Sequence, residues 1–291
     1  MSSATPLVWL IAGTSSGVGR DLTLAALQRG DKVIATARAR SIGQLDQLRE
    51  KGANVLELDV TSPIDKLHEI AKQAVAIHGR VDVLVNNAGY VLVGAIEENT
   101  PQETYDQFNT NVFGGLNVAR AFLPYMRQRK SGSVVWIGSL GAGPRFFFRS
   151  VPDAGLYIST KFALRGLSET LDDEITPLGL RSIIFELGFF HTEFLAASNC
   201  SPYISRIEDY KELTAAVEEQ FVAYNGKQPG DPKKAAKIIV DLVRGEGVTK
   251  GRIVPPVVAL GTDTFEGALQ ASKKTIERLE AWEDVSKSTD F

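Results

Sequence analysis

Cysteine, histidine and long apolar runs are scarce in this chain of 291 residues. A single cysteine, Cys200, excludes an intrachain disulfide framework and fits a reducing compartment. No stretch reaches the roughly 18 consecutive apolar residues that suggest a transmembrane helix, and the N-terminus lacks the basic region of a signal peptide. We therefore expect a cytoplasmic protein without a membrane partner.

Neither sign of charge dominates the sequence. Lys and Arg number 32 against 35 for Asp and Glu, which gives a formal net charge of −3. Nucleic-acid-binding proteins normally carry a basic surplus or a basic stripe. The densest basic stretch, residues 127–130, is better explained as cations that close a helix C-terminus. The sequence therefore predicts no nucleic-acid partner.

The chain has only three histidines, His68, His78 and His191. No pairing of these with Cys200 has the spacing of metal ligands, so we expect no metal site. His68 and His78 fall in a predicted surface helix and are expected to face solvent. His191 directly precedes Thr192 and is a minor candidate for contact with a cofactor or substrate.

Short apolar runs rich in Val, Ile and Leu alternate with helix-length segments. Such continuous runs are typical of strands buried on both faces of a parallel sheet. Strands separated by helices imply right-handed crossovers, with helices covering both faces. The pattern predicts a doubly wound, Rossmann-like α/β fold with three αβα layers. The expected strands are 7–12, 32–37, 53–58, 81–86, 133–138, 181–187 and 251–254.

Helix signals complete this pattern. Ser62 and Pro63 are expected to cap and begin one helix, and Asp231 with Pro232 another. Further helices are expected at 156–176 and 263–284. No linker, repeat or low-complexity tract interrupts the chain, so residues 1–291 are interpreted as a single domain. The alternation pauses from about residue 188 to 231, which we interpret as an inserted lobe.

A glycine-rich turn, Ala-Gly-Thr-Ser-Ser-Gly-Val-Gly at residues 12–19, joins the first strand to the first helix. Glycines there allow positive φ angles and close approach of a phosphate, and the helix N-terminus attracts that phosphate. The spacing is Gly-x3-Gly-x-Gly, unlike the common Gly-x-Gly-x-x-Gly fingerprint. Taken alone, the turn is also compatible with a purely structural role.

Together with the motifs that follow it, this turn resembles that of the short-chain dehydrogenase/reductase family in its single-domain form. Asp59-Val60 resembles the family's adenine-contacting pair, and Asn86-Asn87-Ala88-Gly89 matches its next motif. Gly188 and Thr192 match two positions of its Pro-Gly-x-x-x-Thr motif. The resemblance covers nearly the whole chain. The catalytic tetrad it implies is Asn111, Ser139, Tyr157 and Lys161.

A nicotinamide cofactor is implied by the same resemblance. Its expected binding residues come from the glycine turn, the ends of the following strands and the tetrad helix. They are Gly13, Ser15, Ser16, Gly17, Val18, Gly19, Arg38, Asp59, Val60, Asn87, Ala88, Gly89, Tyr157, Lys161, Gly188, Phe190 and Thr192.

Three departures from the family pattern concern the turn and the substrate side. Ala12 stands where the family usually has Thr, and Leu187 replaces the usual Pro before Gly188. Tyr157 follows Ser139 by 18 positions, about five more than the family usually has. The longer segment includes Arg145-Phe146-Phe147-Phe148-Arg149, so the family gives little guidance on the substrate.

Tyr157 and Lys161 are four residues apart on a predicted helix and therefore share one face. A phenol has a pKa near 10, so proton transfer near neutrality needs a shift of roughly three units, about 4 kcal/mol. A cation about 4 Å away at an effective dielectric constant of about 20 supplies roughly that energy. The lysine is therefore sufficient in principle.

The resemblance assigns a role to each member of the tetrad. Tyr157 exchanges a proton with the carbonyl or alcohol oxygen, and Ser139 hydrogen-bonds that oxygen. Lys161 holds the nicotinamide ribose and lowers the tyrosine pKa. Asn111 holds a water that leads protons to Lys161.

The second strand favours NADP(H) over NAD(H). In this fold an acid after that strand binds an unphosphorylated ribose, whereas an arginine accommodates the 2′-phosphate. Here the strand ends at Ala37-Arg38, Arg40 is close by, and no acid occurs between Asp31 and Asp46.

Three other functions are alternatives to an NADP-dependent ketoreductase. A serine hydrolase needs Gly-x-Ser-x-Gly, but Ile137 stands at the first glycine position. A non-catalytic dinucleotide-binding regulator would commonly lack the Tyr–Lys pair. An NAD-dependent alcohol dehydrogenase running in the oxidative direction stays open. The resemblance also implies a homodimer or homotetramer, paired through the helices around Asn111 and Tyr157.

Aromatic residues predict a bulky apolar or aromatic carbonyl substrate. They occur in the long segment before Tyr157 and in the inserted lobe, both expected near the ligand-binding ends of the strands. Each ring can bury about 150–250 Å², although some must form the core of the lobe. They are Phe146, Phe147, Phe148, Phe189, Phe190, Phe194, Tyr203, Tyr210, Phe221 and Tyr224.

Overall fold

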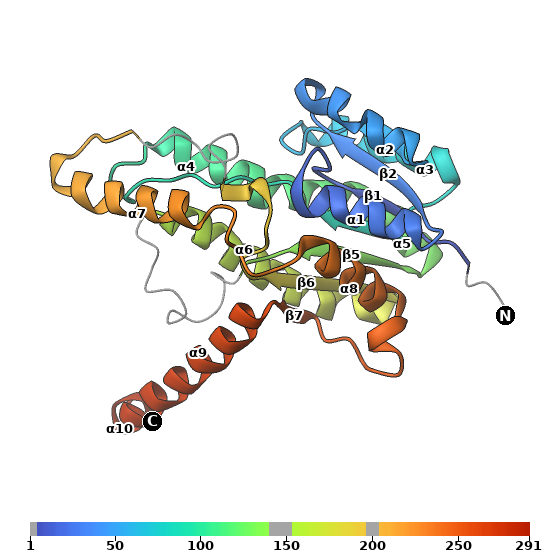
Figure 1. Cartoon of the computed structure of the whole chain (residues 1–291). Helices are drawn as coiled ribbons and strands as arrows, with labels where there is room; N and C mark the ends of the chain where they lie inside the picture. The colour runs from blue at the N-terminus through green and yellow to red at the C-terminus, as the bar shows by residue number, and fades with distance from the viewer. Residues whose placement is uncertain (1–4, 140–152, 196–203) are drawn as a thin grey trace.

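The computed structural model describes residues 5–139, 153–195 and 204–291 (Figure 1). Seven parallel strands form one sheet in the order β3-β2-β1-β4-β5-β6-β7. This order confirms the predicted doubly wound, Rossmann-like fold. The strands are β1 (Val8–Ile11), β2 (Lys32–Ala37), β3 (Asn54–Glu57), β4 (Val83–Asn86), β5 (Gly132–Ile137), β6 (Leu180–Leu187) and β7 (Val257–Leu260).

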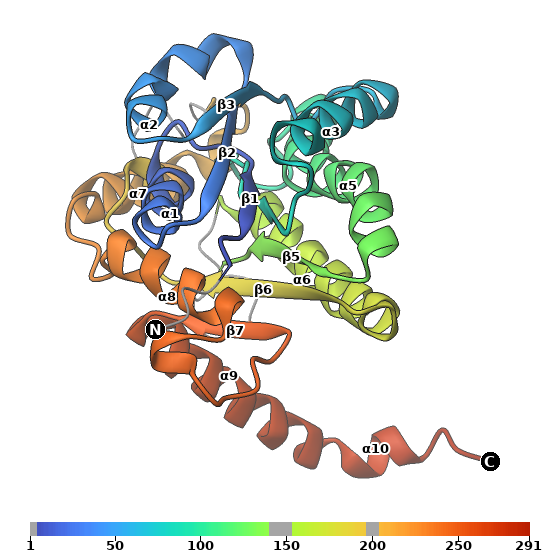
Figure 2. The same ribbon diagram turned by 90° about the vertical axis from the view of Figure 1, so that its right-hand side faces the viewer.

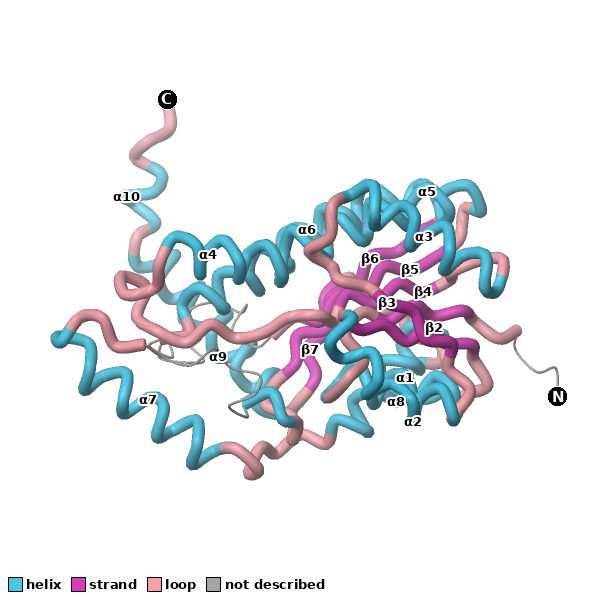
Figure 3. Tube along the Cα trace, turned by 90° about the horizontal axis from the view of Figure 1, so that it is seen from above, coloured by secondary structure: helices cyan, strands magenta, loops and turns pink. Residues whose placement is uncertain are grey.

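Helices cover both faces of the sheet (Figures 2 and 3). One face packs against α1 (Gly17–Gln28) and α8 (Pro232–Arg244), and its core contains the fully buried Trp9. The other face packs against α3 (Ile64–His78), α5 (Gly115–Arg129) and α6 (Gly155–Ile175), around the fully buried Trp136.

Shorter helical segments connect these layers. In chain order they are η1 (Ala39–Leu45), α2 (Asp46–Glu50), α4 (Pro101–Phe108), the π-helical η2 (Asn109–Gly114), η4 (Thr176–Leu178) and η7 (Gly247–Thr249). Within the described part of the chain, no helix is long and apolar enough to cross a membrane. The basic stretch at 127–130 lies at the C-terminal end of α5, as predicted.

The helix after β3 begins one residue later than the sequence indicated. Pro63 is its N-cap residue and Ile64 its first helical residue, and no side chain caps it. The predicted capping role of Ser62 is therefore wrong. Proline fixes φ and has no N–H group to satisfy, so the helix can begin after it without a side-chain acceptor.

The last strand lies further along the chain than predicted. The sequence favoured 251–254, but β7 spans Val257–Leu260 and pairs with β6. Gly251 has a φ of +79°, and Ile253 is 95% exposed. Pro255 and Pro256 follow, and proline cannot donate to a strand ladder. The apolar run before the two prolines therefore stays outside the sheet.

The inserted lobe between β6 and β7 contains η5 (Glu193–Leu195), η6 (Glu208–Tyr210) and α7 (Lys211–Tyr224). The backbone N–H groups of Arg206 and Ile207 both donate to Glu98 at 2.9 Å, in the loop before α4. The Tyr210 hydroxyl donates to neighbouring Glu97 at 2.7 Å. The lobe is thus held to the loop that follows β4.

The tail forms two helices where the sequence predicted one at 263–284. They are α9 (Thr262–Ala281) and α10 (Glu283–Lys287). Trp282 separates them with a φ of −120°. In Figures 1 and 2, α9 leaves the body of the molecule beside β7 and extends away from it.

Candidate functional site

The glycine turn between β1 and α1 has a backbone shape that its sequence dictates. Gly13 and Gly17 have φ angles of +74° and +57°, a region that favours glycine. A Cβ on Gly19 would overlap the carbonyl oxygen of Gly13. The Asn87 side chain spans this narrow space and donates to the carbonyl oxygens of Ala12 and Gly13, at 3.0 and 2.8 Å.

The N-terminus of α1 is suited to an anion. Ser16 is its N-cap residue, and it makes no side-chain capping bond. The first N–H groups of a helix point outward and carry a partial positive charge. A phosphate at this turn would meet these donors, and its binding there stays a prediction.

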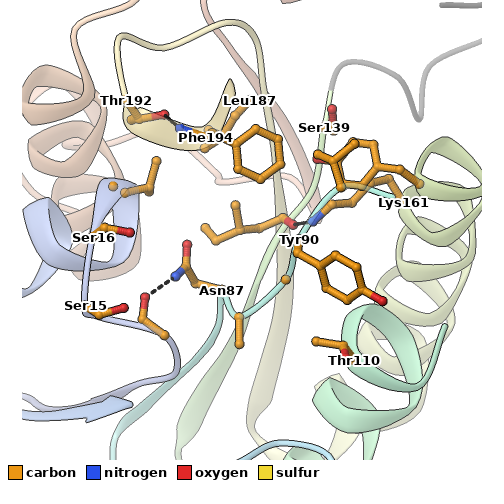
Figure 4. A pocket seen from close by; sticks show the side chains of 18 of the residues that line it. Ser15, Ser16, Asn87, Tyr90, Thr110, Ser139, Lys161, Leu187, Thr192 and Phe194 are labelled. Carbon is orange, nitrogen blue, oxygen red and sulfur yellow. Dashed lines mark hydrogen bonds between the residues drawn. The ribbon is translucent and has the colours of Figure 1, made fainter. Parts of the chain in front are cut away.

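A cavity of about 320 Å³ extends from this turn along the carboxyl ends of the strands. Seventeen of the nineteen expected site residues line it; Gly19 and Asn111 do not. In Figure 4, Ser15 and Ser16 lie on one side of the cavity, and Ser139 and Lys161 on the other. The structure thus brings together residues from both halves of the sheet.

At one end of the cavity, residues that follow β2 and β3 form a rim. Arg38 follows β2 and is exposed, whereas Val60 is buried. The Asp59 carboxylate accepts from the backbone N–H and the hydroxyl of Thr61, at 2.9 and 2.7 Å. Arg40 is not among the lining residues.

At the other end lie Ser139, after β5, and Tyr157 and Lys161 on α6. The Lys161 Nζ lies 5.6 Å from the centre of the Tyr157 ring and donates to the carbonyl oxygen of Ile137 at 2.8 Å. Lys161 is only 6% exposed. Burial lowers the pKa of this ammonium from 10.5 to about 8, because a low dielectric disfavours the charged form.

Asn111 lies beneath the cavity, in the π-helical segment that continues α4. Thr100 and Glu103 form a capping box that starts α4. The Asn111 side chain accepts from the Tyr90 N–H at 3.1 Å and donates to the Tyr90 carbonyl at 3.0 Å. It also lies 3.2 Å from the Thr160 hydroxyl. These bonds hold the segment after β4 in place. The expected role of Asn111 in binding a water stays a prediction.

Gln107 holds the same segment and was not anticipated from the sequence. It is fully buried, accepts from the Leu92 N–H at 2.6 Å and donates to the Tyr90 carbonyl at 2.9 Å. Gln107 and Asn111 are four residues apart, so both amides face the segment after β4. A glutamine four residues before the tetrad asparagine is the sequence signal that could have indicated this role.

Gly188 and Thr192, after β6, line the cavity near the tetrad. A Cβ on Gly188 would overlap the carboxylate of Asp263, at the start of α9. Asp263 Oδ2 accepts from the Phe189 N–H at 2.7 Å. Asp263 was not anticipated as a site residue, because it lies far along the chain from Gly188.

Aromatic rings line the cavity near Tyr157. Phe189, Phe190, Phe194 and Phe221 line the cavity, and Phe194 lies 5.7 Å from the Tyr157 ring. Tyr90, Val91, Ile158 and Gln228 also line it and were not singled out from the sequence.

The other predicted rings lie elsewhere. Tyr210 bonds to Glu97 and Tyr224 packs edge-on against Phe189 at 5.0 Å; neither lines the cavity. Phe146, Phe147, Phe148, Tyr203 and Cys200 lie outside the described residues.

None of the three histidines lines the cavity. His68 and His191 are exposed, and His191 does not line the cavity. His78 was expected to face solvent but is half-buried, and burial lowers its pKa together with the nearby Lys32 and Arg80. Its position in the last turn of α3, beside the start of β2, explains the difference. Across residues 5–139, 153–195 and 204–291, no group of three or more His, Cys, Asp or Glu could hold a metal ion.

Comparison with known proteins is consistent with this geometry. A sequence model described as "short chain dehydrogenase" matches residues 7–201. A solved short-chain dehydrogenase from Streptomyces avermitilis is 37% identical with a TM-score of 0.84, covering 99% of this chain and 100% of its own.

Two curated relatives are also similar. Oxidoreductase BOA17 of Botryotinia fuckeliana is 30% identical over 283 residues, covering 96% of this chain and 97% of the relative. A 3-ketodihydrosphingosine reductase of Bacteroides thetaiotaomicron is 34% identical over 209 residues, 71% of this chain and 72% of the relative.

Proposed function

Because the chain belongs to the short-chain dehydrogenase family of oxidoreductases, we propose that it is an NADP(H)-dependent ketoreductase. It would transfer hydride between the nicotinamide and the carbon of a carbonyl or secondary alcohol. The observation that carries this proposal is the convergence of Ser139, Tyr157 and Lys161 on one cavity that begins at the glycine turn.

The residues present fit a dinucleotide. The uncapped N-terminus of α1 and the space that a Cβ on Gly19 would fill suit a pyrophosphate. Asp59 and Val60 would flank the adenine, and Gly188 and Thr192 the nicotinamide. When bound, the nicotinamide supplies or accepts the hydride, and the protein supplies orientation and electrostatics.

The tetrad residues would manage the proton. Tyr157 would donate its phenolic proton to the carbonyl oxygen as negative charge develops there, and Ser139 would hydrogen-bond the same oxygen. Lys161 favours the phenolate by its charge, and its bond to the Ile137 carbonyl fixes its position. Asn111 would support the site from below by holding the Tyr90 backbone.

The preference for NADP(H) is supported by the rim after β2. Arg38 lines the cavity, whereas Asp31, the acid that precedes it in sequence, is buried and bonded to Arg244. The fold itself accepts either cofactor. A solved structure from Burkholderia phymatum, 20% identical to this chain, is in complex with NAD. A solved polyketide ketoreductase, 24% identical to this chain, is in complex with NADPH.

A bulky apolar ketone is supported by the four phenylalanine rings of the cavity wall. Burying aromatic surface against these rings favours large apolar substrates over small polar ones. The name of the Bacteroides relative, a 3-ketodihydrosphingosine reductase, describes a ketone on a long apolar chain. That substrate belongs to the relative, but its chemistry is compatible with this cavity.

The test follows NADPH consumption against aryl, polycyclic and long-chain ketones, with small polar ketones as the comparison. We expect higher kcat/KM for the large apolar ketones. Tyr157→Phe should lower turnover by at least about 100-fold while NADPH binding stays unchanged. Turnover retained by Tyr157→Phe would refute the proposed chemistry, and a preference for small polar ketones would refute the substrate class.

A further inference from the structure

The C-terminal part of α9 carries an apolar face that the described part of the chain leaves uncovered. Figures 1 and 2 show the helix extending away from the sheet. No described residue after Ala271 is buried. Four residues form what we call the α9 stripe: Phe265, Leu269, Ile276 and Leu279, which are 63%, 48%, 55% and 59% exposed.

The spacing of the stripe is that of a helix packed on another helix. Its members follow at intervals of four, seven and three residues, with Ser272 between Leu269 and Ile276. Alternating steps of three and four are the pattern of a coiled-coil seam. The residues that α9 buries against the body, Thr264, Gly267 and Ala271, lie on another face. The stripe is therefore separate from the contact that attaches α9 to the sheet.

Charges beside the stripe indicate what covers it. Glu266, Lys273 and Glu280 follow at seven-residue intervals along one flank, so their signs alternate. In an antiparallel pair of α9 helices this flank faces its own copy. With Ile276 against the partner's Leu279, each Lys273 lies opposite the partner's Glu280, which gives two reciprocal ion pairs.

Two alternatives fit less well. In a parallel pair the same flank would face Ala268, Thr275 and Trp282, which carry no charge. A helix that lies on an anionic membrane normally has a basic polar face. Residues 262–291 instead contain seven acidic and four basic side chains, so an anionic surface would repel them.

We propose that α9 is a self-association arm, which joins two copies of this chain through an antiparallel contact of their α9 stripes. Lys273 and Glu280 set the direction and register of that contact. This interface is distinct from the one expected around Asn111 and Tyr157, and it does not depend on the proposed enzymatic function.

The first experiment measures the mass of the full-length protein by sedimentation velocity at micromolar concentrations. The wild type should associate. The double variant Ile276→Glu/Leu279→Glu should have half the mass of the wild type, as a monomer in place of a dimer or a dimer in place of a tetramer. Circular dichroism and Tm should match the wild type, because both residues lie beyond the buried part of α9. A monomeric wild type, or a double variant of unchanged mass, would overturn the proposal.

The second experiment reverses the charges. Lys273→Glu or Glu280→Lys alone should weaken association about 5- to 30-fold, because each places like charges opposite one another twice. The variant with both changes should regain wild-type affinity, and so should an equimolar mixture of the two single variants. Equal weakening in the single, double and mixed samples would contradict the proposed register.

A third measurement separates self-association from lipid binding. Wild-type protein is sedimented with vesicles of phosphatidylcholine and phosphatidylserine. The proposal expects the protein to stay in the supernatant. Vesicle binding that is lost in Ile276→Glu/Leu279→Glu would assign the stripe to a membrane surface and overturn the proposal.

Discussion

A carboxylate oxygen of Asp263 occupies the space in which a side chain at Gly188 would have to lie. The other carboxylate oxygen accepts the backbone N–H of Phe189 at 2.7 Å. The start of α9 therefore holds the backbone at the end of β6, beside the tetrad. Leu187 stands here where the family usually has a proline, and the Asp263 bond acts on the backbone two residues later.

Removing that restraint should weaken the cofactor site. We expect Asp263→Ala to raise the Kd for NADPH about 5- to 30-fold, because the Phe189 N–H loses a charged acceptor. Isothermal titration of the folded variant checks this. Asp284→Ala, an exposed acid of α10, should leave the Kd unchanged. An unaltered Kd in Asp263→Ala would show that the carboxylate does not position the cavity wall.

Gly19 should tolerate no side chain. A Cβ there would overlap the Gly13 carbonyl oxygen and press on Asn87. We expect Gly19→Ala to lower the free energy of unfolding by about 1–3 kcal/mol, as overpacking does, and to abolish measurable NADPH binding.

Gly166 in α6 provides the matched control for that change. A Cβ at this exposed helical position meets no atom within 4 Å. Gly166→Ala should therefore raise the free energy of unfolding by about 0.8–1.0 kcal/mol, the difference in helix propensity. Urea unfolding of both variants gives the comparison, and equal effects at the two glycines would contradict the steric constraint at Gly19.

The burial of Lys161 should lower the free energy of unfolding near neutral pH. Its folded-state pKa is about 8 against an ordinary 10.5, so the unfolded chain binds more protons between these pH values and stability rises with pH across that window. Below pH 8 the buried ammonium destabilises the fold. Lys161→Met should therefore be about 1–3 kcal/mol more stable than the wild type at pH 7, and inactive.

Urea unfolding at pH 7 and near pH 10.5 tests this sign. The advantage of Lys161→Met should nearly disappear at the higher pH, where the wild-type lysine is neutral in the folded state and only half protonated in the unfolded chain. Lys51→Met, at an exposed position, should show no such dependence. A Met variant less stable than the wild type at pH 7 would contradict the effect of burial.

Arg38 should decide between the cofactors. It lines the cavity after β2, whereas Arg40 does not. Arg38→Ala should raise the Kd for NADPH about 10- to 100-fold, the value of a hydrogen bond to a charged group, and leave the Kd for NADH unchanged. Arg40→Ala is the matched control. Equal losses for the two cofactors would exclude a contact with a 2′-phosphate.

The motifs at the strand ends could be predicted from the sequence because each is contiguous and follows an apolar run. In a parallel sheet the carboxyl ends of all strands meet at one edge, so Gly13, Asn87 and Ser139 had to converge. The bonds of Asn87 to Ala12 and Gly13 show this proximity of neighbouring strand ends.

Other features depend on contacts that no local pattern encodes. Asp263 and Gly188 meet only because β7 lies beside β6. The apolar run before Pro255 made the predicted position of β7 wrong. In the lobe, no periodic pattern tells which ring faces the cavity, so Phe221 and Tyr224 could not be distinguished. Structure was needed to show that Phe221 lines the cavity while Tyr224 supports Phe189.

The three tryptophans divide the molecule into separately observable parts. Trp9 and Trp136 are fully buried on opposite faces of the sheet, whereas Trp282 is 60% exposed at the end of α9. Indole emission shifts to shorter wavelength in apolar surroundings, so unfolding of the core and events at the tail have different spectral signatures. With Trp282→Phe as a blank, intrinsic fluorescence can follow the tail during assembly without any attached dye.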